Sequence, residues 1–358
     1  MSHVSRLEKL QKKIKATHCD VVLIEDGISL YYLTGCHFSA GTLLVTPSEA
    51  HMIVDGRYLE LARKSLDIPV HLLNEHSLNR LLKQFEAETL GFAQEVTTYA
   101  RYAELQQTLL SKVTLKPIDD PVSSLRMIKD AGEIQRLRDA AELGSKGFEF
   151  VLSLLREGIS ERHLATQLEL FWRAEGGKGP GFEPIIAFGA NSSMPHYRSG
   201  NTALKKGDIV LIDIGVILED YHSDMTRCVF YGKPKAKLME IYEVVRKAQE
   251  QALALCKPDI TTGQLDHAAR SYIEKAGFGK YFTHGLGHGV GREIHEAPRL
   301  SNKPPHADTK LKKGMVVTLE PGVYLPNVGG VRIEDTVVIN AKGYENLSRP
   351  SKEMLILN

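Results

Sequence analysis

Two apolar, strand-like segments of this chain each carry a carboxylate where a core side chain is expected, and this feature most constrains the fold. The run Asp208-Ile-Val-Leu-Ile-Asp-Ile-Gly215 predicts a buried strand that contains Asp213, and the next strand-like segment contains Asp224. A hairpin closed symmetrically around Leu218 and Glu219 places these acids directly opposite each other, with Cβ atoms about 4.5–5.5 Å apart. Because two ionised carboxylates repel strongly at this distance, one must be protonated or a cation must lie between them.

The same arrangement recurs further along the chain. Residues 316–320 and 331–338 form two more strand-like segments, joined by a turn-rich stretch. A hairpin centred on Asn327 places Glu320 opposite Glu334. Because burying an unpaired carboxylate is costly, two facing pairs in one domain favour bound divalent cations.

Each acid taken alone is also compatible with a hydrogen-bonded or salt-bridged carboxylate in the core. Arg227 and Arg332 lie in the same segments and could neutralise part of the charge. The strand register is the weakest step, because neither loop contains the Asn-Gly turn that defines a tight hairpin.

A glycine-rich segment supplies the nitrogen ligand that such a site would need. Thr283-His-Gly-Leu-Gly-His-Gly-Val-Gly-Arg-Glu-Ile-His295 places three histidines among four glycines, and glycine lets a backbone approach a ligand closely. One of these histidines could bind metal, and the others could act as acid/base or oxyanion groups. A separate histidine, His196, lies in a loop-like stretch before the first acidic strand. Carboxylates with one imidazole suit Mn²⁺, Co²⁺ or Zn²⁺. Two such ions activate water and polarise a carbonyl together, so the residues predict a two-metal hydrolase.

The length of 358 residues favours two domains. Alternating strand-like and helix-like stretches predict an α/β domain over residues 1–122. Its helices are expected at 3–16, 58–65 and 78–87, and its strands at 21–24, 30–33, 42–45 and 51–54. Residues 118–121 form a turn-rich connector.

Residues 123–358 predict an α+β domain, with strands and segregated helices. Asp130 followed by Glu133 is a capping-box pattern that begins a long helix. Further helices are expected after Ser160, over 238–256 and over 262–276, the last closed by Gly277.

Composition excludes several classes of function. The net charge of +1 gives no preference for nucleic acid. The longest apolar runs are too short to span a bilayer, and no signal peptide is recognisable. The four cysteines are scattered, as is typical of free thiols in a reducing compartment. These features predict a cytoplasmic protein.

At these residues the sequence resembles metallopeptidase family M24, which includes methionine aminopeptidase, aminopeptidase P and prolidase. The resemblance covers nearly the whole chain. It implies an α+β pita-bread (creatinase/aminopeptidase) catalytic domain preceded by a smaller α/β creatinase-type N-terminal domain. The five metal ligands that it implies are Asp213, Asp224, His288, Glu320 and Glu334.

The resemblance also implies roles around the metals. His196 and His295 match histidines that contact the substrate near the scissile carbonyl, and His284 matches one that shapes a proline pocket. Glu320 matches a ligand that is also the general base. Arg332 matches an arginine that orders the site, and the site-lining tyrosines would be Tyr221 and Tyr324.

The implied reaction is hydrolysis of the bond between an N-terminal residue and a following proline, with Mn²⁺ as the expected metal. An aminopeptidase accepts longer peptides, whereas a dipeptidase (prolidase) accepts only dipeptides. Residues 54–58 resemble aminopeptidase P, whereas Arg299 lies where prolidases often bind the dipeptide carboxylate. His37 lies where a residue from a partner subunit can cap the site in a homodimer. These features favour the aminopeptidase, with the dipeptidase as the alternative.

Other classes remain open at this point. A non-catalytic pita-bread module that binds peptides typically loses metal ligands, and a creatinase-like hydrolase lacks the full ligand set. Methionine aminopeptidase lacks an N-terminal domain of this kind. All three are therefore disfavoured.

Overall fold

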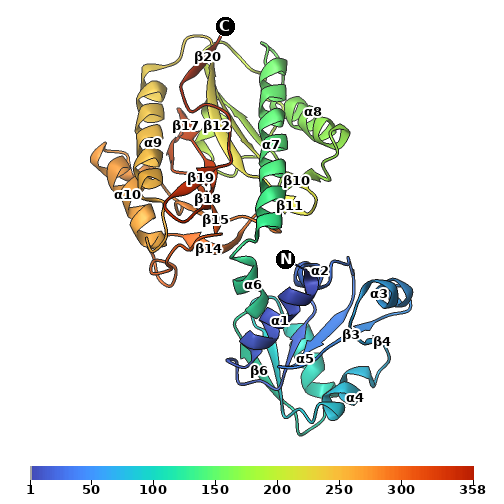
Figure 1. The fold of residues 1–358 in the computed structure, drawn as a ribbon. Coiled ribbons are helices and arrows are strands. Elements are labelled where there is room, and N and C mark those ends of the chain that lie inside the picture. Colours follow the sequence, from blue (N-terminus) through green and yellow to red (C-terminus); the bar gives the residue numbers. More distant parts are fainter. Residues whose placement is uncertain (1) are drawn as a thin grey trace. The chain divides into compact units, whose positions relative to one another are not determined.

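A computed structural model describes residues 2–358, and the chain divides between Arg126 and Met127 into two compact units (Figure 1). The helices of the N-terminal unit are α1 (His3–Ile14), α2 (Gly27–Thr34), α3 (Leu59–Ser65), α4 (Ser77–Gln84), α5 (Tyr99–Thr108) and α6 (Pro121–Arg126). Its strands are β1 (Val21–Ile24), β2 (Thr42–Val45), β3 (Ala50–Val54), β4 (Val70–Leu72), β5 (Thr89–Ala93) and β6 (Thr114–Ile118).

The N-terminal strands form one mixed sheet in the order β4-β3-β2-β1-β5-β6. Both faces of the sheet are covered, because successive side chains of a strand point to opposite sides. Val22 and Ile24 of β1 pack in one apolar cluster with residues of α1 and α2. Val21 and Leu23 pack in another with residues of α4 and α5. The α/β architecture predicted for this part of the chain is confirmed.

The expected strand at residues 30–33 is wrong, because this run belongs to helix α2. The Asp26 side chain accepts a hydrogen bond from the backbone N–H of Ser29 and caps the start of the helix. Gly35 ends the helix in the left-handed conformation, with φ of 74°. A short apolar run does not distinguish a buried helix from a buried strand, so the two capping residues were the better guide.

The C-terminal unit contains four long helices and two short 3-10 helices. They are α7 (Ala131–Leu154), α8 (Glu161–Ala174), η1 (Gly189–Ser193), α9 (Ala236–Leu255), α10 (Thr262–Lys275) and η2 (Gly279–Tyr281). The strands of the first half are β7 (Gly179–Pro180), β8 (Ile185–Phe188), β9 (Asp208–Ile214), β10 (Val216–Leu218), β11 (Tyr221–His222) and β12 (Met225–Tyr231). Those of the second half are β13 (Gly287–Gly289), β14 (Glu296–Leu300), β15 (Val316–Leu319), β16 (Gly322–Leu325), β17 (Gly329–Arg332), β18 (Asp335–Ile339), β19 (Tyr344–Asn346) and β20 (Leu355–Leu357).

The capping signals in the sequence correctly mark the ends of three helices of this unit. Asp130 and Glu133 form the predicted capping box at the start of α7. The Ser160 hydroxyl accepts from the backbone of His163 at the start of α8, and Gly277 follows α10 with φ of 84°. None of the helices within residues 2–358 has the length and apolar character that a membrane span requires.

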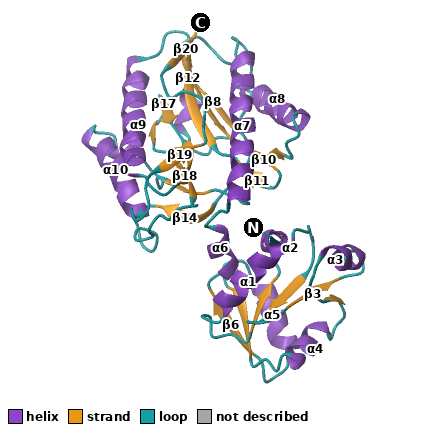
Figure 2. Cartoon of the chain, in the orientation of Figure 1, coloured by secondary structure: helices purple, strands orange, loops and turns teal. Residues whose placement is uncertain are grey.

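Two larger sheets carry the core of the C-terminal unit, in the orders β20-β12-β9-β8 and β14-β13-β15-β18-β19. Strand β9 is buried on both faces. Ile209 and Leu211 share an apolar cluster with residues of α9 and α10, whereas Val210 and Ile212 share one with residues of α7 and α8. Figure 2 shows these two helix pairs on either side of the strands. Asp213, the next-to-last residue of β9, is therefore buried.

Candidate metal centre

The first acidic hairpin differs from the predicted register by two residues. Asp213 of β9 pairs with Thr226 of β12, not with Asp224. The tight turn lies one position later than expected, at Glu219 and Asp220, whose φ angles of 47° and 64° match a two-residue type I′ turn. A shift of two residues keeps every side chain on its original face. Asp213 and Asp224 therefore still share a face, as diagonal rather than direct neighbours.

The second acidic hairpin has the predicted register. Leu325 pairs with Gly329 around Asn327, which has φ of 63°. The pairing of β15 with β18 continues this register beyond the two glutamates. The hairpin centred on Asn327 is thus confirmed, and it places Glu320 opposite Glu334.

Contacts between the two acidic hairpins bring them together. Thr226 and Glu334 form an antiparallel bridge, in which the backbone N–H of Glu334 donates to the Thr226 carbonyl over 3.1 Å. The Thr226 hydroxyl also donates to the Glu334 carboxylate over 2.7 Å. Potential ligand atoms of Asp224, His288 and Glu334 lie within 4.8 Å of one another as a result. The four acids thus converge from strand segments far apart in sequence.

His288 faces the same carboxylates from strand β13. Its Nε2 atom lies 3.6 Å from Asp224 Oδ2 and 3.4 Å from Glu320 Oε1. Its Nδ1 atom lies 3.1 Å from the Gly289 carbonyl, which only accepts hydrogen bonds, so Nδ1 carries the proton. Burial, together with nearby His295, lowers the pKa of His288 to about 4. The ring is therefore neutral at pH 7, and the Nε2 lone pair is directed toward the acids.

The glycines around His288 have a packing role. A Cβ atom at Gly287 would collide with the Thr318 backbone, and one at Gly289 with the Ala297 backbone. The glycines therefore let β13 lie close to its neighbouring segments, rather than only bringing backbone near a ligand as expected. The His288 backbone N–H donates to the Thr318 hydroxyl over 3.1 Å, which fixes the strand beside Glu320.

The acids at the centre disfavour one another's ionised forms. Burial, followed by repulsion from Glu334 and Asp213, raises the pKa of Asp224 well above its ordinary value. Burial and repulsion from Glu334 do the same to the pKa of Glu320. Burial, followed by repulsion from Asp213, raises the pKa of Glu334 to about 8. Carboxylates that are arranged to bind a cation have raised pKa values of this kind when the cation is absent.

The two arginines that could have neutralised the acids have different roles. Arg332 is buried and forms a very close ion pair with Asp213. Arg227 forms an ion pair with Asp335 over 2.6 Å instead. Side chains 334 and 335 point to opposite faces of the strand, so Arg227 lies behind the centre. Arg332 therefore pairs directly with one of the four clustered carboxylates, whereas Arg227 acts on Glu334 only from the opposite face.

A chain of hydrogen bonds runs from Arg332 to His284. The guanidinium donates to the Tyr324 hydroxyl over 2.7 Å, and that oxygen lies 2.9 Å from His284 Nε2. His284 Nδ1 lies 2.8 Å from the Gly285 carbonyl, so Nε2 accepts the tyrosine proton. Burial lowers the pKa of His284 to about 4. The contacts therefore hold His284 in one orientation beside Tyr324.

The remaining expected site residues of this unit divide into two groups. His295 packs edge-to-face on His288, with ring centroids 4.3 Å apart, and the positive potential of Arg299 and His196 lowers its pKa after burial. Arg299 of β14 pairs directly with His288. The Tyr221 hydroxyl points to α7 instead of the acids, and it donates to Glu133 over 2.9 Å.

His37 belongs to the N-terminal unit. It is exposed on the surface, and its ring stacks on Tyr31 with centroids 4.0 Å apart. Its suggested position at the site of a partner subunit stays a prediction.

Sequence reasoning missed two threonines that organise the acids. Thr226 donates to Glu334 and accepts from Arg332 Nε over 3.2 Å. Thr318 bonds to both the His288 backbone and the Glu320 carboxylate. Both belong to the acidic strand segments, one on the same face as Asp213 and one on the same face as Glu320. Their position on the same strand face as an acid could have identified both threonines from the sequence.

The side chains at the centre fit divalent cations. The cluster combines hard carboxylate oxygens with one neutral imidazole nitrogen, and it contains no thiolate. His288 is oriented by a carbonyl on its other nitrogen, as metal-binding histidines usually are. The fold and the site thus define a metalloenzyme whose centre is dominated by carboxylates.

Comparisons with known proteins agree with this class. Residues 135–341 match the model described as metallopeptidase family M24, and residues 6–128 match the creatinase/prolidase N-terminal domain. This chain belongs to metallopeptidase family M24, and the pita-bread fold predicted for it is confirmed.

Similar proteins match over their full length. The chain is 38% identical to an Xaa-Pro dipeptidase of Pyrococcus furiosus, covering 98% of this chain and 99% of that one. The structure of an Xaa-Pro dipeptidase from Bacillus anthracis has a TM-score of 0.95 at 34% identity, covering 99% and 100% of the two chains. An X-Pro aminopeptidase structure from Thermotoga maritima has a TM-score of 0.87 at 30% identity, covering 97% and 99%.

Proposed function

We propose that this metallopeptidase is an Xaa-Pro dipeptidase that requires two divalent metal ions. The proposed ligands are Asp213, Asp224, His288, Glu320 and Glu334. The observation that carries the proposal is the direct pairing of Arg299 with His288 across two strands. Directly paired residues present their side chains on the same face of a sheet, so an exposed guanidinium lies beside a proposed ligand.

Arg299 suits a substrate whose second residue ends in a free carboxylate. A guanidinium binds a carboxylate through two parallel hydrogen bonds. A dipeptide offers that group one residue from the scissile bond, whereas a longer peptide continues as a neutral amide. The same arginine thus attracts dipeptides and gives no equivalent contact to longer chains.

The names of similar proteins support the dipeptidase over the aminopeptidase that the sequence favoured. Proteins called Xaa-Pro dipeptidase or prolidase match from two Pyrococcus species and from Bacillus anthracis. The aminopeptidase from Thermotoga maritima shares the fold at 30% identity, compared with 34–36% for the Bacillus anthracis dipeptidase and the two Pyrococcus prolidases. An aminopeptidase therefore remains the second candidate.

The proposed chemistry assigns a separate task to each group at the centre. Bound metal ions would supply an activated water and polarise the scissile carbonyl. Glu320 would take up the proton that the attacking water loses, as a carboxylate beside the water can do. His196 and His295 would donate hydrogen bonds to the oxygen that becomes negative. His284 and Tyr324 would form a wall against which the proline ring packs. We propose Mn²⁺ as the metal, because carboxylates dominate the ligands.

A substrate-length assay tests the choice between the two peptidases. With Mn²⁺ present, the protein is expected to hydrolyse an Xaa-Pro dipeptide and to leave the matching Xaa-Pro-Yaa tripeptide largely intact. Rates for both peptides are measured at equal concentrations. Faster cleavage of the tripeptide would favour the aminopeptidase, and cleavage of neither by the Mn²⁺-loaded protein would refute Xaa-Pro specificity.

Replacement of Arg299 by methionine is expected to weaken dipeptide binding. A charged hydrogen bond contributes about 1.5–3 kcal/mol, so KM should rise about 10- to 100-fold while kcat changes little. The control is the same dipeptide with a C-terminal amide, which lacks the carboxylate and should not distinguish the variant from the wild type. An equal rise of KM for acid and amide would argue against carboxylate recognition.

A further inference from the structure

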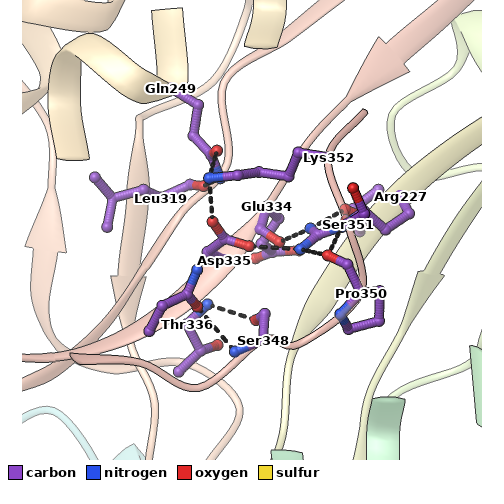
Figure 3. A network of polar contacts seen from close by, with 12 residues as sticks. Arg227, Gln249, Leu319, Glu334, Asp335, Thr336, Ser348, Pro350, Ser351 and Lys352 are labelled. Carbon is purple, nitrogen blue, oxygen red and sulfur yellow. Dashed lines mark hydrogen bonds and ion pairs between the residues drawn. The ribbon is translucent and has the colours of Figure 1, made fainter. Parts of the chain in front are cut away.

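The segment Ser348–Lys352 packs behind the strands that carry the acids (Figure 3). The Lys352 ammonium donates to Asp335 Oδ2 over 2.7 Å and to Gln249 Oε1 over 2.9 Å. Asp335 and Gln249 have no exposed surface, and the Lys352 side chain is 22% exposed. One cation therefore joins two buried groups from β18 and α9.

Both partners of Lys352 act next to a proposed ligand. Asp335 directly follows Glu334, and the two side chains point to opposite faces of the strand. The Gln249 amide donates over 3.1 Å to the carbonyl of Leu319, which directly precedes Glu320. Lys352 thus links the backbones on which the two facing glutamates are carried.

Arg227 extends the same network along the strand. Its Nη1 atom donates to the Glu334 carbonyl over 2.5 Å, and its Nη2 atom to Asp335 Oδ1 over 2.6 Å. The Pro350 carbonyl accepts from the same guanidinium. The segment is therefore linked to the Glu334 backbone indirectly, through Arg227 and through Asp335.

A third connection reaches Asp224. The Ser348 hydroxyl accepts from the backbone N–H of Thr336 over 3.0 Å. The Thr336 hydroxyl in turn donates over 2.7 Å to the Asp224 carbonyl. Asp224, Glu320 and Glu334 are thus all connected to segment Ser348–Lys352. Each connection runs through the ligand's own backbone or through a neighbouring residue.

The contacts of segment Ser348–Lys352 oppose the electrostatic repulsion between the acids at the metal centre. The carboxylates of Glu320 and Glu334 repel each other, and that repulsion pushes their strands apart. The contacts through Lys352 lie on the opposite face and tie the same strands together. Metal affinity depends on such outer partners, which keep the ligands at their required separation before the ion binds.

We propose that Lys352 and Gln249 are positioning residues, which hold Glu320 and Glu334 at the separation that the metal ions need. The proposal rests on the ligand roles assigned above. It predicts that Lys352→Met leaves the fold intact, because Asp335 keeps its ion pair with Arg227. The variant should nevertheless bind metal more weakly.

The test is a calorimetric titration of metal-free protein with Mn²⁺. Wild-type protein should bind two ions, and Lys352→Met should raise the dissociation constant of at least one about 10- to 100-fold. Lys352→Arg retains the cation and should restore tight binding. Lys342→Met removes the same charge from an exposed turn residue and should leave both constants unchanged.

The outcomes separate this proposal from the function on which it rests. Wild-type affinities in Lys352→Met, or weak binding in Lys352→Arg, would overturn the positioning role alone. Wild-type protein that binds no Mn²⁺ would overturn the ligand set and this inference together. Gln249→Glu provides an independent variant if Lys352→Met does not fold. It keeps an acceptor for Lys352 but loses the donor to Leu319, so weaker binding is expected, and unchanged binding would contradict the proposal.

Discussion

Replacement of Glu320 by glutamine is expected to lower kcat for an Xaa-Pro dipeptide by about 10²- to 10⁴-fold, the usual contribution of a general base. The amide has nearly the same shape but no charge, so it neither takes up a proton nor attracts a cation as the carboxylate does. Weaker metal binding should add to the loss. Steady-state kinetics at saturating Mn²⁺ measure the effect.

The same substitution should not destabilise the metal-free protein. Glu320 is one of four clustered acids, and repulsion from its charge helps to raise the pKa of Asp224. Removing one charge relieves that repulsion, so the thermal midpoint should stay constant or rise. Glu345→Gln is the control, because it changes an acid that pairs with Arg138 away from the centre. Substantial turnover by Glu320→Gln would exclude Glu320 as the base.

Removal of the metal ions is expected to abolish activity and to make stability fall as the pH rises. Folding raises the pKa of Asp224, Glu320 and Glu334, with Glu334 reaching about 8. Between the ordinary carboxyl pKa and these values, the folded metal-free chain binds more protons than the unfolded chain. Its free energy of unfolding therefore decreases with pH, by up to about 1.4 kcal/mol per pH unit for each proton.

Urea unfolding of the metal-free protein at about pH 5 and about pH 8 measures this slope. With Mn²⁺ in excess the loss should disappear, because metal binds the ionised carboxylates and displaces their protons. Greater stability at the higher pH without metal would contradict the repulsive cluster.

Much of the metal centre could be predicted from the sequence. Burying an unpaired acid in an apolar strand costs free energy, and side chains alternate between the two faces of a strand with a period of two. The second hairpin was correct, since Asn327 lies at the midpoint between Glu320 and Glu334. The first was wrong by two residues, because the turn formed at Glu219 and Asp220 without a glycine. The error kept both aspartates on one face.

Contacts between distant segments could not be predicted in this way. The bridge of Thr226 to Glu334 joins two sheets, and no local period in either strand reveals it. Lys352 and Gln249 are far apart in sequence, so their contact depends on how the final segment packs. The homodimer is likewise a prediction from resemblance, and sedimentation of the purified protein would test it.

Two metal ions at the carboxylate cluster are proposed to make this chain an Xaa-Pro dipeptidase. The most direct test of this function is to add Mn²⁺ stepwise to metal-free protein while hydrolysis of an Xaa-Pro dipeptide is measured. Activity is predicted to be absent without metal and to reach its plateau when two ions are bound per chain. Full hydrolysis by the metal-free protein, or none with two ions bound, would contradict it.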